Sequence, residues 1–331
     1  MTGFLTGSYT APKGSGAGIG VLSDGRWWPV ADAVESPSFV VAHPRHPVVY
    51  AAAEFERRIH AFRWDDGRLV PLGAPQEAGA AACHLRLSPS NDRLVATGWA
   101  DGSIASYPIA DDGALGAPAW GTRAVDPYDG AEGEWAAAPR QSRGHASLFL
   151  DDETMLTTDL GFDLLRVWSV AGGLRHLRDI ALPHGTGPRH LLRHPDGPLH
   201  IVTEYSNEVL TVVGDELAGR TAITAGGMAQ GDTAAEIALH PSGRWLTVTV
   251  RGSNRLAVLS VDGTTVHPVM DVSTGGVTPR HHAHDGDLVL VANQRSHEVV
   301  RFAMDAGTGQ LARLDAIAVG SPTCLAPLPV Y

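Results

Sequence analysis

PRHLLRHPDGPLHIVTEYSNEVLTVV, residues 188–213, recurs in similar form as AAEIALHPSGRWLTVTVRGSNRLAVL, residues 234–259. Each copy contains a short apolar run, a turn (HPDG or HPSG), a strand-like run rich in Val, Leu and Thr, a polar turn and an alternating strand. A unit that repeats at a fixed period is the sequence signature of a repeat fold. These two copies therefore define the unit from which the fold of the whole chain can be predicted.

The same unit can be followed along the 331 residues through one equivalent position, here called the anchor, near the start of each copy. Successive anchors are separated by 45, 62, 44, 46, 45 and 43 residues. Periods near 45 with several short strands each are typical of β-propeller blades. We therefore predict an all-β fold, a single seven-bladed β-propeller spanning residues 1–331 with four-stranded blades. Its anchors are Ser38, Cys83, His145, Arg189, Ala235, Arg280 and Thr323.

The two ends of the chain are expected to meet in one blade. The last copy begins at Pro322 and contains only a first strand, whereas the N-terminal segment GFLTGSYT, residues 3–10, resembles a second strand. Pairing of these segments would close the ring and remove the free sheet edges that an open array exposes.

The one long spacing contains an insertion at about residues 119–143. Trp120, Tyr128 and Trp135 lie in it among several acidic residues. Long loops in compact arrays are often functional, and this one leads directly into His145. We expect the insertion to border the mouth of the central channel; the alternative is a surface loop without contact to substrate.

Composition and charge exclude several classes of function. The chain has 38 glycines and 22 prolines but only 18% charged residues, which favours β structure with many turns. Its formal net charge is −11 and Lys13 is its only lysine, which argues against nucleic-acid binding, a Walker A loop and a Schiff-base lysine. No apolar run reaches membrane-spanning length and the N-terminus lacks a signal-peptide pattern. We expect a cytoplasmic protein, a monomer or weak homo-oligomer, that binds no membrane.

Repeat-equivalent residues of a propeller form rings around its axis, because the first strand of each blade lines the channel. The anchors form one ring. A second ring follows the next strand of each copy and comprises Glu54, Trp99, Leu160, Glu204, Arg251 and Gln294. The two rings predict that charged and imidazole side chains from distant parts of the sequence meet at one face: His145, Arg189, Glu204, Arg251 and Arg280.

A series of short motifs resembles the lactonase family of seven-bladed β-propellers, which includes propeller-type 6-phosphogluconolactonases and the fungal carboxy-cis,cis-muconate cyclase. In order they are GSYT (7–10), RQ (140–141) with GHAS (144–147), GPRH (187–190), TEY (203–205), AAEI (234–237), VRG (250–252) and LVANQ (290–294). The resemblance covers essentially the whole chain. It implies a channel site with a histidine, two arginines and a glutamate, which fall on His145, Arg189, Glu204 and Arg251.

The sequence departs from the family pattern at three positions near these motifs. Arg143 stands where the family usually has the first histidine of a His-x-His pair. Thr203 and Val250 stand where an asparagine often precedes the glutamate and the arginine. These departures concern the substrate rather than the fold.

The chemistry of the four residues suits an anionic lactone. Lactone hydrolysis requires a base for water, stabilisation of an oxyanion and a proton for the leaving alkoxide. Glu204 is predicted as the base and His145 as the acid, while Arg189 and Arg251 hold an anionic group or the oxyanion. The alternative for each is structural: the imidazole ties a blade turn, and the arginines pair with Glu204 and Glu236 in a channel network.

Six further polar residues near the two rings are predicted to bind substrate, with the alternative that they tie neighbouring blades together: Glu236, His190, His84, Glu54, Gln294 and Arg280. The segment HHAH, residues 281–284, suggests a metal site, but on a strand the second and fourth of these residues share a face while the first points away. We therefore predict no metal and no cofactor. The absence of GxSxG argues against the serine hydrolase arrangement.

The leading functional hypothesis is an enzyme that hydrolyses an anionic small-molecule lactone, such as a sugar-acid lactone, in the central channel. The first alternative is a cycloisomerase of the muconate-lactonising type, which would use the same groups. The second is a non-catalytic propeller that binds a partner through its faces.

Overall fold

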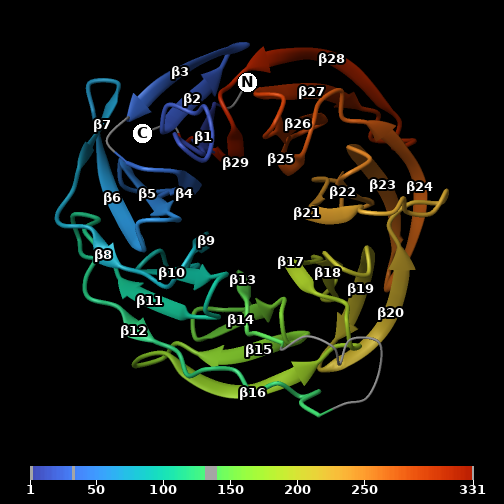
Figure 1. Ribbon diagram of the computed structural model, residues 1–331, viewed down its shortest axis with the longest axis horizontal. Helices are drawn as coiled ribbons and strands as arrows, with labels where there is room; N and C mark the ends of the chain where they lie inside the picture. The colour runs from blue at the N-terminus through green and yellow to red at the C-terminus, as the bar shows by residue number, and fades with distance from the viewer. Residues whose placement is uncertain (1–2, 32–33, 131–139, 330–331) are drawn as a thin grey trace.

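The computed structural model describes residues 3–31, 34–130 and 140–329, and in these residues it contains strands and turns but no helix. The strands form seven antiparallel sheets arranged as a ring around one axis (Figure 1). Within this part of the chain, accordingly, no helix has the length and apolar character needed to cross a membrane. The predicted seven-bladed propeller is confirmed.

Each blade is given from its innermost strand outward. The blade that joins the termini contains β29 (Pro322–Pro327), β1 (Phe4–Ser8), β2 (Ile19–Ser23) and β3 (Arg26–Ala31). The second blade contains β4 (Pro37–Ala42), β5 (Val48–Ala53), β6 (Arg58–Asp65) and β7 (Arg68–Pro71), and the short β8 (Gln76–Glu77) also pairs with β6. The third blade contains β9 (Ala82–Leu87), β10 (Arg93–Gly98), β11 (Ile104–Pro108) and β12 (Ala119–Trp120). The fourth blade contains β13 (Gly144–Phe149), β14 (Thr154–Asp159), β15 (Leu164–Ser169) and β16 (Arg175–Ala181). The last three contain β17 (Pro188–Arg193), β18 (Leu199–Thr203), β19 (Glu208–Val213) and β20 (Glu216–Ala222); β21 (Thr233–Leu239), β22 (Trp245–Arg251), β23 (Arg255–Asp262) and β24 (Thr265–Ser273); and β25 (Pro279–Asp285), β26 (Leu288–Asn293), β27 (Glu298–Met304) and β28 (Leu311–Ala318).

The ring closes through β29 and β1, as the sequence predicts. These strands pair antiparallel, with Phe4 opposite Pro327 and Gly7 opposite Cys324. The blade that the two chain ends share packs against the next blade as the other blades pack against each other. One apolar cluster contains Leu5 of the shared blade and Val40 of the next.

Apolar side chains fill the spaces between neighbouring blades. Each sheet is covered on both faces, so its second strand is buried along nearly its whole length rather than on alternate residues. In β5, VVYAAA, all six residues are buried. The outermost strands, such as β20, are largely exposed. Packing between blades therefore fixes the position of the inner strands, from which the channel side chains project.

Every innermost strand contains one extra residue at its anchor. In β25, Pro279 pairs with Asn293 and His281 with Ala292, so Arg280 has no opposite residue. Equivalent register shifts occur in the other six innermost strands. A β-bulge bends the strand and re-aims a side chain. It allows two consecutive residues, such as Arg280 and His281, to face the channel at different depths.

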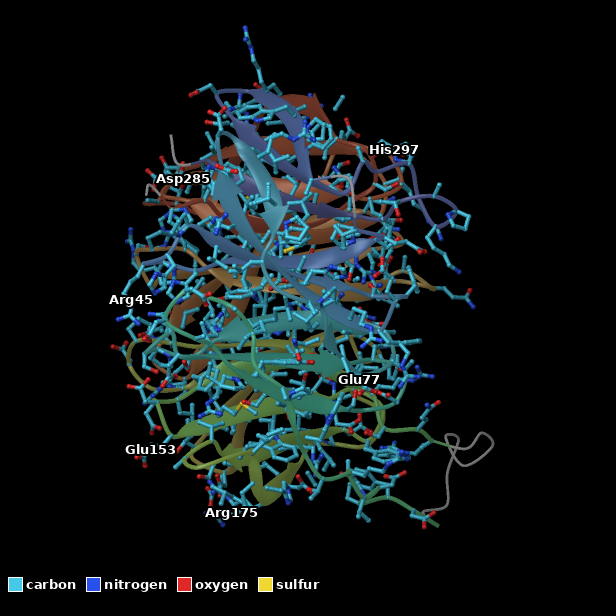
Figure 2. The ribbon with its side chains drawn as sticks, turned by 90° about the vertical axis from the view of Figure 1, so that its left-hand side faces the viewer. Arg45, Glu77, Glu153, Arg175, Asp285 and His297 are labelled. Atoms are coloured by element: carbon cyan, nitrogen blue, oxygen red, sulfur yellow. The ribbon has the colours of Figure 1, made fainter. Side chains whose placement is uncertain are left out.

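The two faces of the disc carry different turns. Figure 2 shows Arg45, Glu153 and Asp285 on one face, at turns between first and second strands, and His297 on the other face, between β26 and β27. Glu54, Glu204 and Arg251 end or follow second strands. They therefore lie toward the same face as His297.

Candidate active site

A cavity of about 180 Å³ lies at the axis and is lined by eight residues from six blades. Half of its lining comes from anchors on innermost strands, and half from residues that end or follow second strands. The anchors are Cys83, His145, Arg189 and Arg280; the others are Glu54, Trp99, Glu204 and Arg251. The structure thus brings together all four residues predicted to be catalytic, together with Glu54 and Arg280 from the predicted substrate-binding group.

Glu204 joins the two arginines on one wall of the cavity. Its Oε2 lies 3.0 Å from Arg189 Nε and 2.9 Å from Arg251 Nη2. Arg189 also donates a hydrogen bond from Nη1 to the Ala235 carbonyl oxygen, which ties it to the next blade. Burial lowers the pKa of Arg189 to about 10, so it remains a cation at neutral pH. In the described chain Glu204 Oε1 accepts no hydrogen bond, and it is available to a ligand.

A second acid and arginine face this group across the cavity. Glu54 Oε2 accepts a hydrogen bond from the Tyr9 hydroxyl at 2.8 Å and lies 3.7 Å from Arg280 Nη2. The Arg280 guanidinium lies over the Tyr9 ring, 5.1 Å from its centroid. Tyr9 follows β1 as Glu54 follows β5, so it is the closing blade's equivalent of Glu54. The sequence prediction missed it, although aligning GSYT with the other second strands would have found it.

His145 lies beside the arginines as a neutral imidazole. It is buried, and its Nδ1 has no hydrogen-bond partner among the described residues. Burial, together with the charge of Arg189, holds the pKa of His145 well below its usual range. In the free protein this ring therefore acts as a neutral hydrogen-bonding group. Binding of an anion would offset the charge of Arg189 and raise the tendency of His145 to take up a proton.

Cys83 lines the same cavity but is a protonated thiol. Its Sγ faces the carbonyl oxygens of Thr97, Gly144 and His145 at 3.6–3.9 Å. Burial raises the pKa of Cys83 to about 12, and a thiol rather than a thiolate is a poor nucleophile.

We expect Cys83→Ser to keep activity within about threefold of the wild type, because the thiol contributes only a weak donor. Iodoacetamide at pH 7.5 should leave activity intact, since the thiolate fraction is only on the order of 10⁻⁴ to 10⁻⁵. Mass spectrometry after timed alkylation measures this directly. Cys324, whose pKa burial also raises to about 12, is the internal reference. Rapid alkylation of Cys83 alone, with matching loss of activity, would contradict the assignment.

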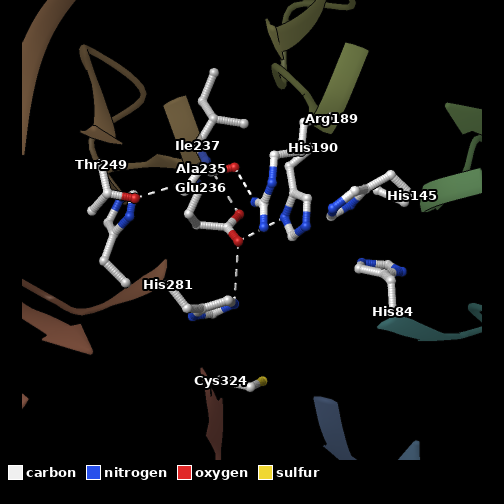
Figure 3. Close-up of polar contacts among 12 residues, drawn as sticks. His84, His145, Arg189, His190, Ala235, Glu236, Ile237, Thr249, His281 and Cys324 are labelled. Carbon is white, nitrogen blue, oxygen red and sulfur yellow. Dashed lines mark hydrogen bonds and ion pairs between the residues drawn. The ribbon is translucent and has the colours of Figure 1, made fainter. Parts of the chain in front are cut away.

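A second polar layer lies beneath the cavity and is centred on Glu236 (Figure 3). Glu236 Oε2 is 2.6 Å from His190 Nδ1 and 3.3 Å from His281 Nε2. The His190 ring contacts the rings of His145 and His84, with centroids 5.0 and 5.4 Å away. Burial raises the pKa of Glu236, although His281 and Arg189 act against this.

The six predicted substrate-binding residues fall into two groups, because Glu54 and Arg280 line the cavity and the other four do not. Glu236, His190 and His84 are outside the lining of the 180 Å³ cavity and follow their anchors by one position. Gln294, which follows β26, is also outside it, and its backbone N–H donates to the Thr278 carbonyl oxygen. For these four residues a role in substrate binding stays a prediction.

The histidines of HHAH point in two directions. His281 faces Glu236 in the channel, whereas His282 Nε2 and His284 Nε2 both lie 2.8 Å from Thr247 Oγ1. The predicted division of this segment between two faces is therefore confirmed. Within residues 3–31, 34–130 and 140–329, no group of three or more His, Cys, Asp or Glu side chains is arranged to hold a metal ion.

The insertion runs between β12 and β13. The Tyr128 hydroxyl donates to the Leu182 carbonyl oxygen at 2.6 Å, and Arg140 pairs with Asp126 at 2.8 Å and Asp163 at 2.9 Å. Trp135 lies outside the described residues. At the end of the insertion, the Arg143 guanidinium lies 4.0 Å from the ring centroid of Trp99, a cavity residue. Control of substrate access by the whole insertion stays a prediction.

The family model described as "Lactonase, 7-bladed beta-propeller" matches residues 4–327 of this chain. The chain belongs to this lactonase family. Its relatives include the 6-phosphogluconolactonase of Bacillus subtilis (strain 168), 25% identical over 310 residues, with 88% of this chain and 86% of the relative covered. A 6-phosphogluconolactonase of Formosa agariphila is 24% identical over 341 residues, covering 94% of each chain. Among solved structures, a periplasmic gluconolactonase of Pseudomonas aeruginosa has a TM-score of 0.85 and 25% identity, with 98% of each chain covered.

Proposed function

We propose that this member of the lactonase family hydrolyses a sugar-acid lactone, and that the reaction takes place in the 180 Å³ channel cavity. The observation that carries the proposal is the convergence of Arg189 and Arg251 on one oxygen of Glu204, beside a buried neutral imidazole. A carboxylate, two fixed guanidinium groups and an imidazole are the groups that ester hydrolysis requires. The names of the relatives, 6-phosphogluconolactonase and gluconolactonase, support the substrate class.

The proposed reaction uses the free oxygen of Glu204 as the base. Glu204 Oε1 removes a proton from water as the water oxygen attacks the lactone carbonyl carbon. Guanidinium N–H groups of Arg189 and Arg251 stabilise the oxyanion of the tetrahedral intermediate. When an anionic substrate offsets the charge of Arg189, His145 takes up a proton from solvent. The bond from the carbonyl carbon to the ring oxygen then breaks, and the His145 imidazolium donates this proton to the leaving alkoxide and becomes neutral again. Glu204 releases to solvent the proton that it took from water, which restores both groups.

The charges of the cavity suit an anionic substrate. Three guanidinium groups and two carboxylates line it, which gives one excess positive charge when Glu54 and Glu204 are ionised. Arg189 is buried, so an anion near it is screened less than at the surface. This favours lactones with an anionic substituent.

The test is acid release in a pH-stat at pH 7, with EDTA present because the proposal needs no metal. The panel holds δ-gluconolactone, 6-phosphogluconolactone and muconolactone, together with carboxymuconate followed by its ultraviolet absorbance. Catalysed acid release from a sugar-acid lactone supports the proposal. Loss of diene absorbance without lactone hydrolysis would replace it with the cycloisomerase alternative, and inactivity on the whole panel would overturn the substrate class.

Two further expectations accompany the proposal. We infer a cytoplasmic location, although one similar solved structure is of a periplasmic gluconolactonase. We also infer a monomer or weak homo-oligomer that binds neither nucleic acid nor membrane, supported by the net charge of −11. Fractionation of the source cells and light scattering of the purified protein test these inferences.

A further inference from the structure

The arginines that line the cavity are already paired with carboxylates. Arg189 and Arg251 both contact Glu204, at 3.0 and 2.9 Å, and Arg280 lies 3.7 Å from Glu54. A second strongly charged group on a substrate would have to compete with these pairs. Such a group is therefore better accommodated by a cation near the cavity that has no carboxylate partner.

Arg143 is such a cation. In the described ranges of the chain, its guanidinium is not paired with a carboxylate, and it lies over the ring of Trp99, 4.0 Å from the ring centroid. Trp99 lines the cavity and is 38% exposed, so the pair stands at the boundary between the cavity and solvent. Arg143 also lies directly before β13 and precedes His145, a cavity residue, by two positions.

The contact with Trp99 leaves the N–H groups of the Arg143 guanidinium without a carboxylate acceptor in the described residues. When a guanidinium lies flat over an aromatic ring, its face makes the cation–π contact and its N–H groups point outward in the plane. Those N–H groups match the oxygens of a phosphate or carboxylate and can bind two of them at once. Stacking also restricts the side chain before the ligand arrives, which reduces the entropic cost of binding.

The backbone that carries Arg143 is held in place. Its N–H donates to Asp159 Oδ1 at 2.8 Å, and its carbonyl oxygen accepts from the Leu160 N–H at 2.8 Å. The Asp159 carboxylate also accepts from the N–H groups of Gly161 and Phe162, at 3.1 and 3.0 Å. Arg143 therefore projects from a fixed turn.

Tyr205 is a second aromatic residue close enough to Arg143 to feel its charge. Burial and the neighbouring Glu204 raise the pKa of the Tyr205 phenol, while the charge of Arg143 acts in the opposite direction. Tyr205 is 45% exposed and directly follows Glu204, the proposed base. The Arg143 charge therefore acts on a residue that is adjacent in sequence to Glu204.

We propose that Arg143, stacked on Trp99, forms a distal subsite that binds an anionic group at the far end of the lactone's side chain. The inference rests on the proposed function and deepens it: Glu204, Arg189, Arg251 and His145 act on the lactone ring, and Arg143 selects lactones with a terminal phosphate or carboxylate. A lactone whose side chain ends in a hydroxyl reaches the same catalytic groups but lacks the partner for Arg143.

The test compares wild type with Arg143→Gln on 6-phosphogluconolactone, a glucaric acid monolactone and δ-gluconolactone, which end in a phosphate, a carboxylate and a hydroxyl. We expect kcat/KM for whichever of the two charged lactones the wild type prefers to fall about 10- to 100-fold, mainly through a higher KM. We expect kcat/KM for δ-gluconolactone to change less than about twofold. If kcat/KM falls only for 6-phosphogluconolactone, the subsite binds a phosphate. If it falls only for the glucaric acid monolactone, the subsite binds a carboxylate. Equal loss on all three, or no loss on any, overturns the proposal.

Two variants serve as controls. Arg143→Lys keeps the charge but loses the planar fork, so we expect an intermediate KM for the charged lactone. Arg175→Gln removes an exposed arginine from the outer strand β16 (Figure 2) and should leave kcat/KM unchanged for all three substrates. Thermal unfolding of each variant shows whether a loss reflects folding.

A binding experiment separates this proposal from the proposed function. Calorimetric titration with 6-phosphogluconate, glucarate and gluconate reports on the subsite without turnover. If the protein hydrolyses no lactone but binds a terminally charged acid through Arg143, the subsite stands and the proposed reaction fails. If lactones are hydrolysed while the Arg143→Gln variant binds all three acids as the wild type does, the reaction stands and the subsite is wrong.

Discussion

Replacing Glu204 by glutamine is expected to lower kcat for lactone hydrolysis by about a thousandfold or more, with a much smaller effect on KM. The amide keeps the size of the side chain but cannot accept a proton from water, and positioned bases contribute about 10²- to 10⁴-fold. It also removes the charge that holds Arg189 and Arg251 at 3.0 and 2.9 Å, so the oxyanion donors lose their common anchor. Single-turnover and steady-state kinetics on the preferred lactone measure the effect.

The matched control is Glu208→Gln in the same blade. Glu208 Oε2 pairs with Arg220 Nη2 at 2.7 Å, but this pair lies on the outer strands β19 and β20 and is partly exposed. Such pairs contribute little to stability, and this one is remote from the cavity. We expect its kinetics to match the wild type. A Glu204→Gln variant that folds and retains more than about a tenth of wild-type kcat would show that another group removes the proton from water.

The ring was predictable because the repeat is regular. Spacings near 45 residues place each anchor on an innermost strand, and symmetry then brings distant residues to one axis. His145, Arg189, Glu204 and Arg251 line one cavity for this reason. The partner of each arginine was less predictable. Both reach the same oxygen of Glu204, which depends on side-chain conformations that a repeat pattern does not specify.

The arrangement of the channel side chains in two layers was not predictable from the alternation of side-chain direction along a strand. In a regular strand His190 would point away from the side that Arg189 faces. The bulge at each anchor adds one residue and brings His190 and Glu236 into the channel beneath the cavity. The sequence shows the polar residues but not the bulge, so it does not separate Glu236 and His190 from the residues that line the cavity. Tyr9 was missed because the first blade is divided between the two ends of the chain.

The buried histidines predict a steep loss of stability in mild acid. Burial holds the pKa values of five channel and near-channel imidazoles well below the usual range, and for His281 it gives about 4. These groups stay neutral in the folded protein, whereas unfolded histidine takes up a proton near pH 6.5. Their contribution to stability is therefore fully present above about pH 6.5 and is lost as the pH falls toward about 4. The five are His84, His145, His190, His281 and His282.

The size of the effect follows from proton linkage. Each histidine that binds a proton only when unfolded lowers the free energy of unfolding by about 1.4 kcal/mol per pH unit, so five give up to about 7 kcal/mol per unit. The raised pKa of Glu236 acts in the opposite direction, because the folded protein takes up that proton first as the pH falls. Urea unfolding followed by tryptophan fluorescence between pH 7.5 and 5 measures the slope.

Two single variants make this prediction specific. His282 is 1% exposed, lies outside the cavity lining and contacts Thr247, so His282→Gln should reduce the slope by about 1.4 kcal/mol per pH unit. His267 is exposed on the outer strand β24, so His267→Gln should leave the slope unchanged. Because a glutamine does not titrate, the difference between the two variants isolates burial from the mere presence of a histidine. Equal slopes for wild type and both variants would show that His282 takes up its proton as readily in the folded as in the unfolded state, and that acid sensitivity arises elsewhere.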